Sequence, residues 1–165
     1  MKMDNENKKE QVLNPEAFRR GRVHRILAHS YTLYFALFLV GVCLDIIFRF
    51  KIFASSTMVP IGIILLAIAS LLIFWAQKTS RNLDIANMSV ESFRKGPYRY
   101  TRNPTHWGLF FLMLGFGIIA NAVFVILSTL VSFLISKLYF LRKQENILAI
   151  KYGAPYLEYK KRVKF

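Results

Sequence analysis

Polar and aromatic side chains gather in one short block, Gly96 to Gly108, which reads GPYRYTRNPTHWG. Asn103 precedes Pro104, and a proline at the first helical position after an asparagine cap predicts that a helix begins here. The free N–H groups of that helix end, with Arg102 nearby, favour an anionic group such as a carboxylate or a phosphate. The block is equally typical of an aromatic and basic belt at a membrane surface, so the pattern leaves both interpretations open.

A second polar block is the C-terminal segment Arg142 to Phe165, RKQENILAIKYGAPYLEYKKRVKF. Its apolar and aromatic residues recur every three or four positions, which predicts an amphipathic helix interrupted at Gly153 to Pro155, lying on anionic headgroups. Gln144 and Glu145 stand at its start, where an amide and a carboxylate can accept hydrogen bonds from an amine or a ribose hydroxyl. If the two blocks lie at the same depth, they close one pocket.

The elements that must position these blocks are long apolar runs. The chain has 165 residues, 55% of them hydrophobic, yet its formal charge is +14, which is typical of a membrane protein with its charge in the loops. The runs are Ser30 to Phe48, Thr57 to Ala76, Trp107 to Ile119 and Ala122 to Leu141. They predict an all-α, polytopic membrane protein with about four transmembrane helices, the last two forming a hairpin, followed by the amphipathic C-terminal segment.

The basic residues predict the orientation of this bundle. Segment 1–29 holds seven Lys and Arg, loop 77–106 six and segment 142–165 seven, so one side carries 20 of the 23. By the positive-inside rule that side is cytoplasmic, and both termini with it, in a multi-pass protein. We expect a single domain over 1–165, with the bundle at 30–141. At the opposite interface, the four-residue spacing of Asp45 and Arg49 predicts an ion pair.

Other chemistries lack a pattern in this sequence. Cys43 is the single cysteine and the three histidines are scattered, so no metal site is expected. No glycine-rich nucleotide loop and no nucleophile elbow are present. The basic residues follow the membrane side instead of forming a soluble patch, which disfavours nucleic acid as a partner.

Together the two blocks resemble the integral membrane methyltransferases related to isoprenylcysteine carboxyl methyltransferase and phospholipid methyltransferases. The resemblance covers about Ser92 to Val163 and rests on Gly96, Tyr98, Arg102, Asn103, Pro104, Gly108, Glu145, Leu148, Gly153, Tyr156, Tyr159 and Val163. At four positions the chain departs from the isoprenylcysteine pattern: Asn103 replaces a histidine, His106 a tyrosine, Gln144 a glutamate and Phe140 an arginine.

The resemblance implies a cofactor, S-adenosylmethionine, and a hydrophobic methyl acceptor that enters from the bilayer. Carried over by position, the cofactor-binding residues are Ser92, Phe93, Tyr98, Asn103, Pro104, Thr105, His106 and Gln144. We predict Arg102 and Glu145 as catalytic residues and Arg142 and Trp107 as substrate-binding residues, with Arg142 or Arg102 in place of the arginine that Phe140 replaces. Membrane lipids are the expected partners.

The predicted reaction is a direct displacement in which the protein aligns donor and acceptor and excludes water. A carboxylate acceptor, as in isoprenylcysteine, needs no base, whereas an amine needs one such as Glu145 or His106. Two other interpretations stay open: an NADPH-dependent enzyme like the membrane sterol reductases, and a non-catalytic membrane adaptor, which the changes at Asn103, His106 and Gln144 allow.

Overall fold

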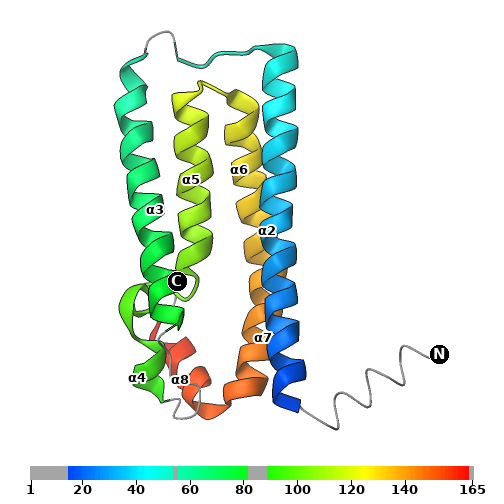
Figure 1. The fold of residues 1–165 in the computed structure, drawn as a ribbon, viewed down its shortest axis with the longest axis vertical. Coiled ribbons are helices and arrows are strands. Elements are labelled where there is room, and N and C mark those ends of the chain that lie inside the picture. The colour runs from blue at the N-terminus through cyan, green and yellow to red at the C-terminus, as the bar shows by residue number, and fades with distance from the viewer. Residues whose placement is uncertain (1–14, 54–55, 82–88, 164–165) are drawn as a thin grey trace, which may run out of the picture.

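The computed structural model describes residues 15–53, 56–81 and 89–163, and within these ranges every regular element is a helix (Figure 1). The predicted all-α class is therefore confirmed. Part of the predicted N-terminal segment (1–14), part of the predicted loop (82–88) and both chain ends lie outside the described residues.

Three helical stretches are long and apolar enough to cross a membrane: Ala28–Phe48, Val59–Arg81 and Val123–Ile150. The first belongs to α2 (Pro15–Phe48) and the second is α3 (Val59–Arg81). The third runs without a break through α6 (Val123–Ile135), the π-helical turn η3 (Ser136–Phe140) and α7 (Leu141–Tyr152). Their length and composition confirm the predicted transmembrane character.

The remaining helices are shorter. The first arm of the predicted hairpin is α5 (Pro104–Ile119), whose 16 residues at about 1.5 Å each cover about 24 Å, less than the apolar thickness of a bilayer. A fourth crossing thus stays a prediction. The other short elements are η1 (Ser56–Met58), α4 (Val90–Phe93), η2 (Gly96–Arg99) and α8 (Ala154–Arg162).

The bundle is built from two helix pairs, α3 with α5 and α2 with α6, which run side by side (Figure 1). Small residues bring α3 and α5 close together: a Cβ atom added at Gly115 would lie 2.8 Å from the carbonyl oxygen of Gly62. Such close backbone approach is typical of helix packing in membranes, where dispersion contacts replace the hydrophobic effect. The α5–α6 hairpin then joins the two pairs.

At the hairpin end of the bundle, where α5 turns into α6, side chains bond to backbone groups. Asn121 has a φ of +52° in this turn, and its amide accepts hydrogen bonds from the N–H groups of Ile52 and Phe53 and donates one to the Phe53 carbonyl. The turn predicted around Asn121 is therefore confirmed.

Asp45, near the same end, has a different partner from the predicted one. Its carboxylate oxygens accept from the N–H groups of Phe124 and Val125 at 3.1 and 2.9 Å, and no ion pair joins it to Arg49 among the described residues. The predicted ion pair is wrong because α2 ends at Phe48 and Arg49 has a φ of +52°, so the helical spacing that would bring the two side chains together does not reach Arg49, and Asp45 bonds to the free N–H groups at the start of α6.

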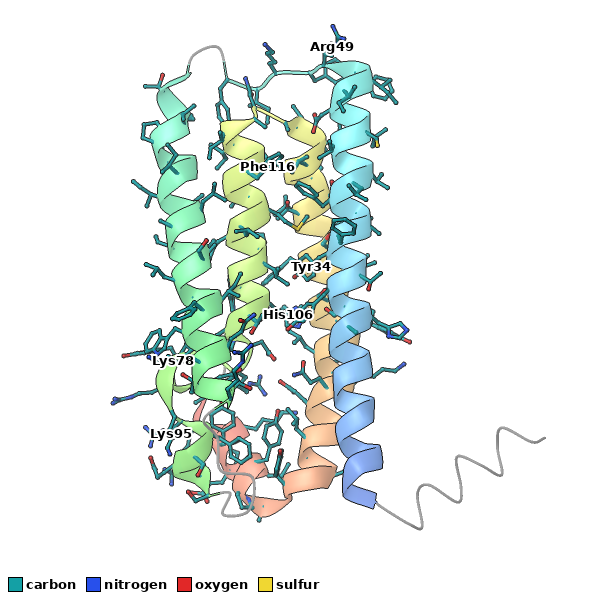
Figure 2. The ribbon with its side chains drawn as sticks, viewed as in Figure 1. Tyr34, Arg49, Lys78, Lys95, His106 and Phe116 are labelled. Atoms are coloured by element: carbon teal, nitrogen blue, oxygen red, sulfur yellow. The ribbon has the colours of Figure 1, made fainter. Side chains whose placement is uncertain are left out.

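At the other end, here called the α8 end, the amphipathic segment folds back under the bundle (Figure 1). Gly153 has a φ of +61° and separates α7 from α8, which confirms the predicted interruption. Tyr156, Tyr159 and Val163 form a buried cluster that packs against Val90 and Phe93 of α4. Figure 2 shows Lys78 and Lys95 at this end and Arg49 at the opposite one.

Candidate functional site

The site begins at the loop that leads into α5. Asn103 occupies the predicted capping position and Pro104 the first turn, but the Asn103 side chain makes no capping hydrogen bond. Its backbone carbonyl instead accepts from the N–H of His106 at 3.2 Å. The prediction of a side-chain cap is thus wrong, and the amide of Asn103 is left to face the cavities described next.

The first of these, the inner cavity, has a volume of about 230 Å³ and lies between the loop before α5, the middle of α2, the end of α3 and the start of α7. It is lined by six of the eight predicted cofactor-binding residues, Tyr98, Asn103, Pro104, Thr105, His106 and Gln144. Tyr31 of α2 and Gln77 and Ser80 of α3 complete much of its wall. Aromatic faces, amides, hydroxyls and a helix N-terminus therefore surround one space.

The second, the outer cavity, has a volume of about 250 Å³ and lies between α5 and the stretch from α6 to α7. It brings together all four residues predicted for catalysis and substrate binding, Arg102, Trp107, Arg142 and Glu145. Lys137 adds another cation, and Phe133, Leu138 and Leu141 add apolar surface. Cationic groups beside apolar side chains suit a molecule with an anionic head and a hydrophobic body.

Arg102, Asn103 and His106 line both cavities and form the partition between them. His106 is only 3% exposed, and neither of its ring nitrogens has a hydrogen-bond partner among the described residues. Its ring lies 6.1 Å from that of Tyr31 and 5.9 Å from that of Tyr34. Figure 2 labels His106 and Tyr34. A buried imidazole without partners costs stability, so this arrangement favours a ligand that bonds to it.

The Glu145 carboxylate holds two cations at this site. One oxygen lies 2.7 Å from Arg102 and the other 2.8 Å from Lys160 of α8. The Glu145 and Arg102 side chains are 14% and 17% exposed, so this ion pair is largely shielded from water. Because both oxygens contact cations, Glu145 holds Arg102 and Lys160 together at the site.

The α8 helix also supports the inner cavity through a tyrosine. The hydroxyl of Tyr159 donates to the carbonyl of Tyr98 at 2.8 Å, which holds the η2 turn against α8. Burial raises the pKa of the Tyr98 hydroxyl and that of Tyr159, so both remain neutral donors at physiological pH. The ring of Tyr98 therefore faces the cavity as an uncharged aromatic surface.

Two predicted cofactor-binding residues lie apart from both cavities. Ser92 exchanges hydrogen bonds with Ser89 in the capping box of α4. Phe93 packs against Tyr152, Tyr156 and Tyr159 with ring centroids 5.2 to 5.5 Å apart. Contact of Ser92 and Phe93 with a cofactor stays a prediction, and in this structure they support α8.

From the sequence we did not predict the cavity-lining residues of α2 and α3, nor Lys137 in the apolar stretch from α6 to α7. Tyr31 lies in α2, and it also lines a third, apolar cavity of about 380 Å³ between α2, α3 and α5. The family resemblance began at Ser92, so nothing placed α2 at the site. Lys137 carried a usable signal, since it is the one charge in an otherwise apolar run.

Apolar helices that surround two polar cavities at one end define an integral membrane protein with an interfacial site. Comparison with known proteins agrees: the sequence model described as phospholipid methyltransferase matches residues 57–155, which include both polar blocks up to Pro155. The chain therefore belongs to the phospholipid methyltransferase family, which indicates methyl transfer to a membrane substrate. No curated protein and no solved structure matches the chain.

Proposed function

We propose that the protein transfers a methyl group from S-adenosylmethionine to the headgroup of a membrane phospholipid. The observation that carries this proposal is the pair of cavities with a common partition of Arg102, Asn103 and His106. A donor on one side and an acceptor on the other meet at that partition, and alignment is the main contribution that a displacement reaction requires of a protein.

The inner cavity fits the cofactor by its chemistry. When bound there, S-adenosylmethionine supplies an electrophilic methyl group on a sulfonium. The neutral ring of Tyr98 offers a face to that cation, and the hydroxyl and amide groups of Ser80, Gln77 and Gln144 suit ribose and amino groups. Arg102 and the N–H groups at the start of α5 suit the carboxylate.

The outer cavity fits the acceptor. The cationic side chains of this cavity suit an anionic group of the acceptor, and Glu145 keeps the Arg102 guanidinium in place at the partition through their 2.7 Å contact. Trp107 and the apolar side chains beside it exclude water from the partition. Glu145 thus acts as a positioning residue in this scheme.

His106 handles the proton when the acceptor is an amine. Burial lowers the pKa of the His106 imidazole, so the ring is neutral at physiological pH, and its ring nitrogens have no partner among the described residues. A ring nitrogen can accept a hydrogen bond from the N–H of a neutral amine, and the proton passes to the imidazole as the new C–N bond forms. A carboxylate acceptor is ionised already and has no use for this group.

The direct test is methyl incorporation by the purified protein in phospholipid vesicles with S-adenosylmethionine labelled in its methyl group. We expect label in the phospholipid fraction, identified by mass, with phosphatidylethanolamine as the amine acceptor and a prenylcysteine analogue as the carboxylate comparison. Label found only in the prenylcysteine product would mean that the acceptor is a prenylcysteine carboxylate and not a phospholipid. No label in either, with binding of NADPH and none of S-adenosylmethionine, would overturn the proposal in favour of a reductase.

A further inference from the structure

Lys137 is a cation inside the longest apolar stretch of the chain. At about 1.5 Å per residue it lies about 21 Å along the helix from Val123, well within the depth of an apolar bilayer core. Ionisable groups at such depth are costly and usually serve a site. Lys143, six residues on, has a structural role instead, since its ammonium bonds to the Tyr139 hydroxyl at 2.8 Å and lies 4.4 Å from that ring.

The π-helical turn determines where Lys137 faces. The Leu141 N–H bonds to the carbonyl of Ser136, five residues back, which is the spacing of a π-helix. In a regular α-helix two residues five apart point about 140° away from each other, whereas the wider turn brings them towards one face. Lys137 and Arg142 are five apart, and both line the outer cavity.

The turn is supported from the neighbouring helix. Ser136 is 1% exposed, and its hydroxyl lies 3.3 Å from that of Ser30 in α2. Isolated π-turns inside α-helices are frequent at functional sites, because the extra residue reorients the side chains that follow. Here the reoriented side chains are the two cations.

The outer cavity therefore has an excess of positive charge. Arg102, Lys137 and Arg142 contribute three positive charges and Glu145 one negative charge, a balance of +2. Arg102 is bound to Glu145, whereas Lys137 and Arg142 make no ion pair with any described residue. Two cations on one face, next to Phe133 and Leu138, suit a phosphodiester with an apolar body attached.

The structure assigns to Lys137, set beside Arg142 by the π-turn, the recognition of the acceptor's phosphodiester. This inference rests on the proposed function, since it names the part of the phospholipid acceptor that the outer cavity binds. With the phosphate held between Lys137 and Arg142, the headgroup beyond it extends towards Arg102 and His106. Lys137 is then a specificity-determining residue that takes no part in the displacement.

The test measures lipid binding without turnover. In a Trp75→Phe background, Trp107 is the remaining tryptophan and lines the outer cavity, so lipids with brominated chains report on that cavity by quenching its fluorescence. Brominated phosphatidylethanolamine is titrated by mole fraction into detergent micelles, and brominated diacylglycerol, which has no phosphate, serves as the comparison. The variants are Lys137→Gln, Lys137→Arg and the matched control Lys143→Gln.

We expect Lys137→Gln to need about tenfold more phosphatidylethanolamine for half-quenching, as loss of a charged contact to phosphate implies. Lys137→Arg and Lys143→Gln should stay within twofold of the parent, and diacylglycerol quenching should not change. Equal quenching by phosphatidylethanolamine in Lys137→Gln and the parent would overturn the inference. So would a Lys137 effect seen with a brominated S-alkyl cysteine and absent with phosphatidylethanolamine, because the site would then be a carboxylate site.

The same proteins also separate the inference from the proposed function. If Lys137→Gln weakens phosphatidylethanolamine binding but the parent transfers no label, the phosphate site stands and the proposed reaction fails. If the parent methylates phosphatidylethanolamine and Lys137→Gln leaves both the KM for the lipid and the quenching unchanged, the reaction stands and the role of Lys137 fails.

Discussion

Replacing Glu145 by glutamine tests the idea that this carboxylate positions Arg102. The substitution keeps the shape of the side chain and removes the charge that lies 2.7 Å from Arg102 and 2.8 Å from Lys160. Arg102 stays charged in Glu145→Gln, so the variant can keep a hydrogen bond to the guanidinium and loses the attraction between two opposite charges. For this mostly buried contact we expect a loss of about 1–2 kcal/mol. A loss of about 1.4 kcal/mol in transition-state stabilisation lowers the rate tenfold. We therefore expect kcat/KM for methyl transfer to fall by about 5- to 30-fold.

The assay is label transfer to phosphatidylethanolamine at several lipid mole fractions, with Glu158→Gln as the matched control. Glu158 pairs with Arg162 at 2.5 Å on the exposed surface of α8, where such a pair contributes little, so this variant should keep at least half of the parent rate. Combining Glu145→Gln with Arg102→Gln should cost much less than the sum of the two single effects. Additive losses, or a Glu145→Gln rate above half of the parent rate, would refute a positioning role.

Three further changes test other parts of the structure. Asp45→Ala should lower the free energy of unfolding in micelles by about 2 kcal/mol, since it removes both hydrogen bonds to the start of α6, and Asp45→Asn should lose less. Gly115→Ala places a methyl carbon 2.8 Å from the Gly62 carbonyl oxygen and should cost about 1–3 kcal/mol; an unchanged Tm would contradict the close contact. His106→Phe should keep the fold but slow transfer to an amine acceptor by about 100-fold, measured by label incorporation with saturating cofactor, while a carboxylate acceptor is affected much less.

The helices could be predicted because apolar runs and turn residues act locally. The break at Asn121 and the interruption at Gly153 were both visible in the sequence, and both are positions of positive φ. The bounds of the helices could not all be predicted from the sequence. The helix α2 begins at Pro15, well before the apolar run Ser30 to Phe48. Helix formation depends on local backbone preference, whereas the apolar run marks only the part of a helix that a membrane would surround.

The site could be predicted only as far as its residues lie in the two polar blocks. Both blocks line the cavities, but Asp45 and Tyr31 acquire their partners from helices far away in the chain. The spacing of Asp45 and Arg49 favoured a local ion pair, and a distant helix N-terminus took its place. The five-residue spacing of Lys137 and Arg142 becomes meaningful only with the π-turn, which no local pattern indicates.

The two ends of the bundle are held by different forces. At the hairpin end, Asp45 and Asn121 bond to backbone groups over short, fixed distances. At the α8 end, ion pairs of Glu145 with Arg102 and Lys160 act beside the buried tyrosine cluster and the bond from Tyr159 to the Tyr98 carbonyl, and the Lys160 side chain is 40% exposed. Dissolved salt screens exposed charge pairs far more than hydrogen bonds to the backbone. A rise in ionic strength should therefore loosen α8 and the cavities above it while the hairpin end stays closed, so that amide exchange with solvent would increase at one end of the molecule only.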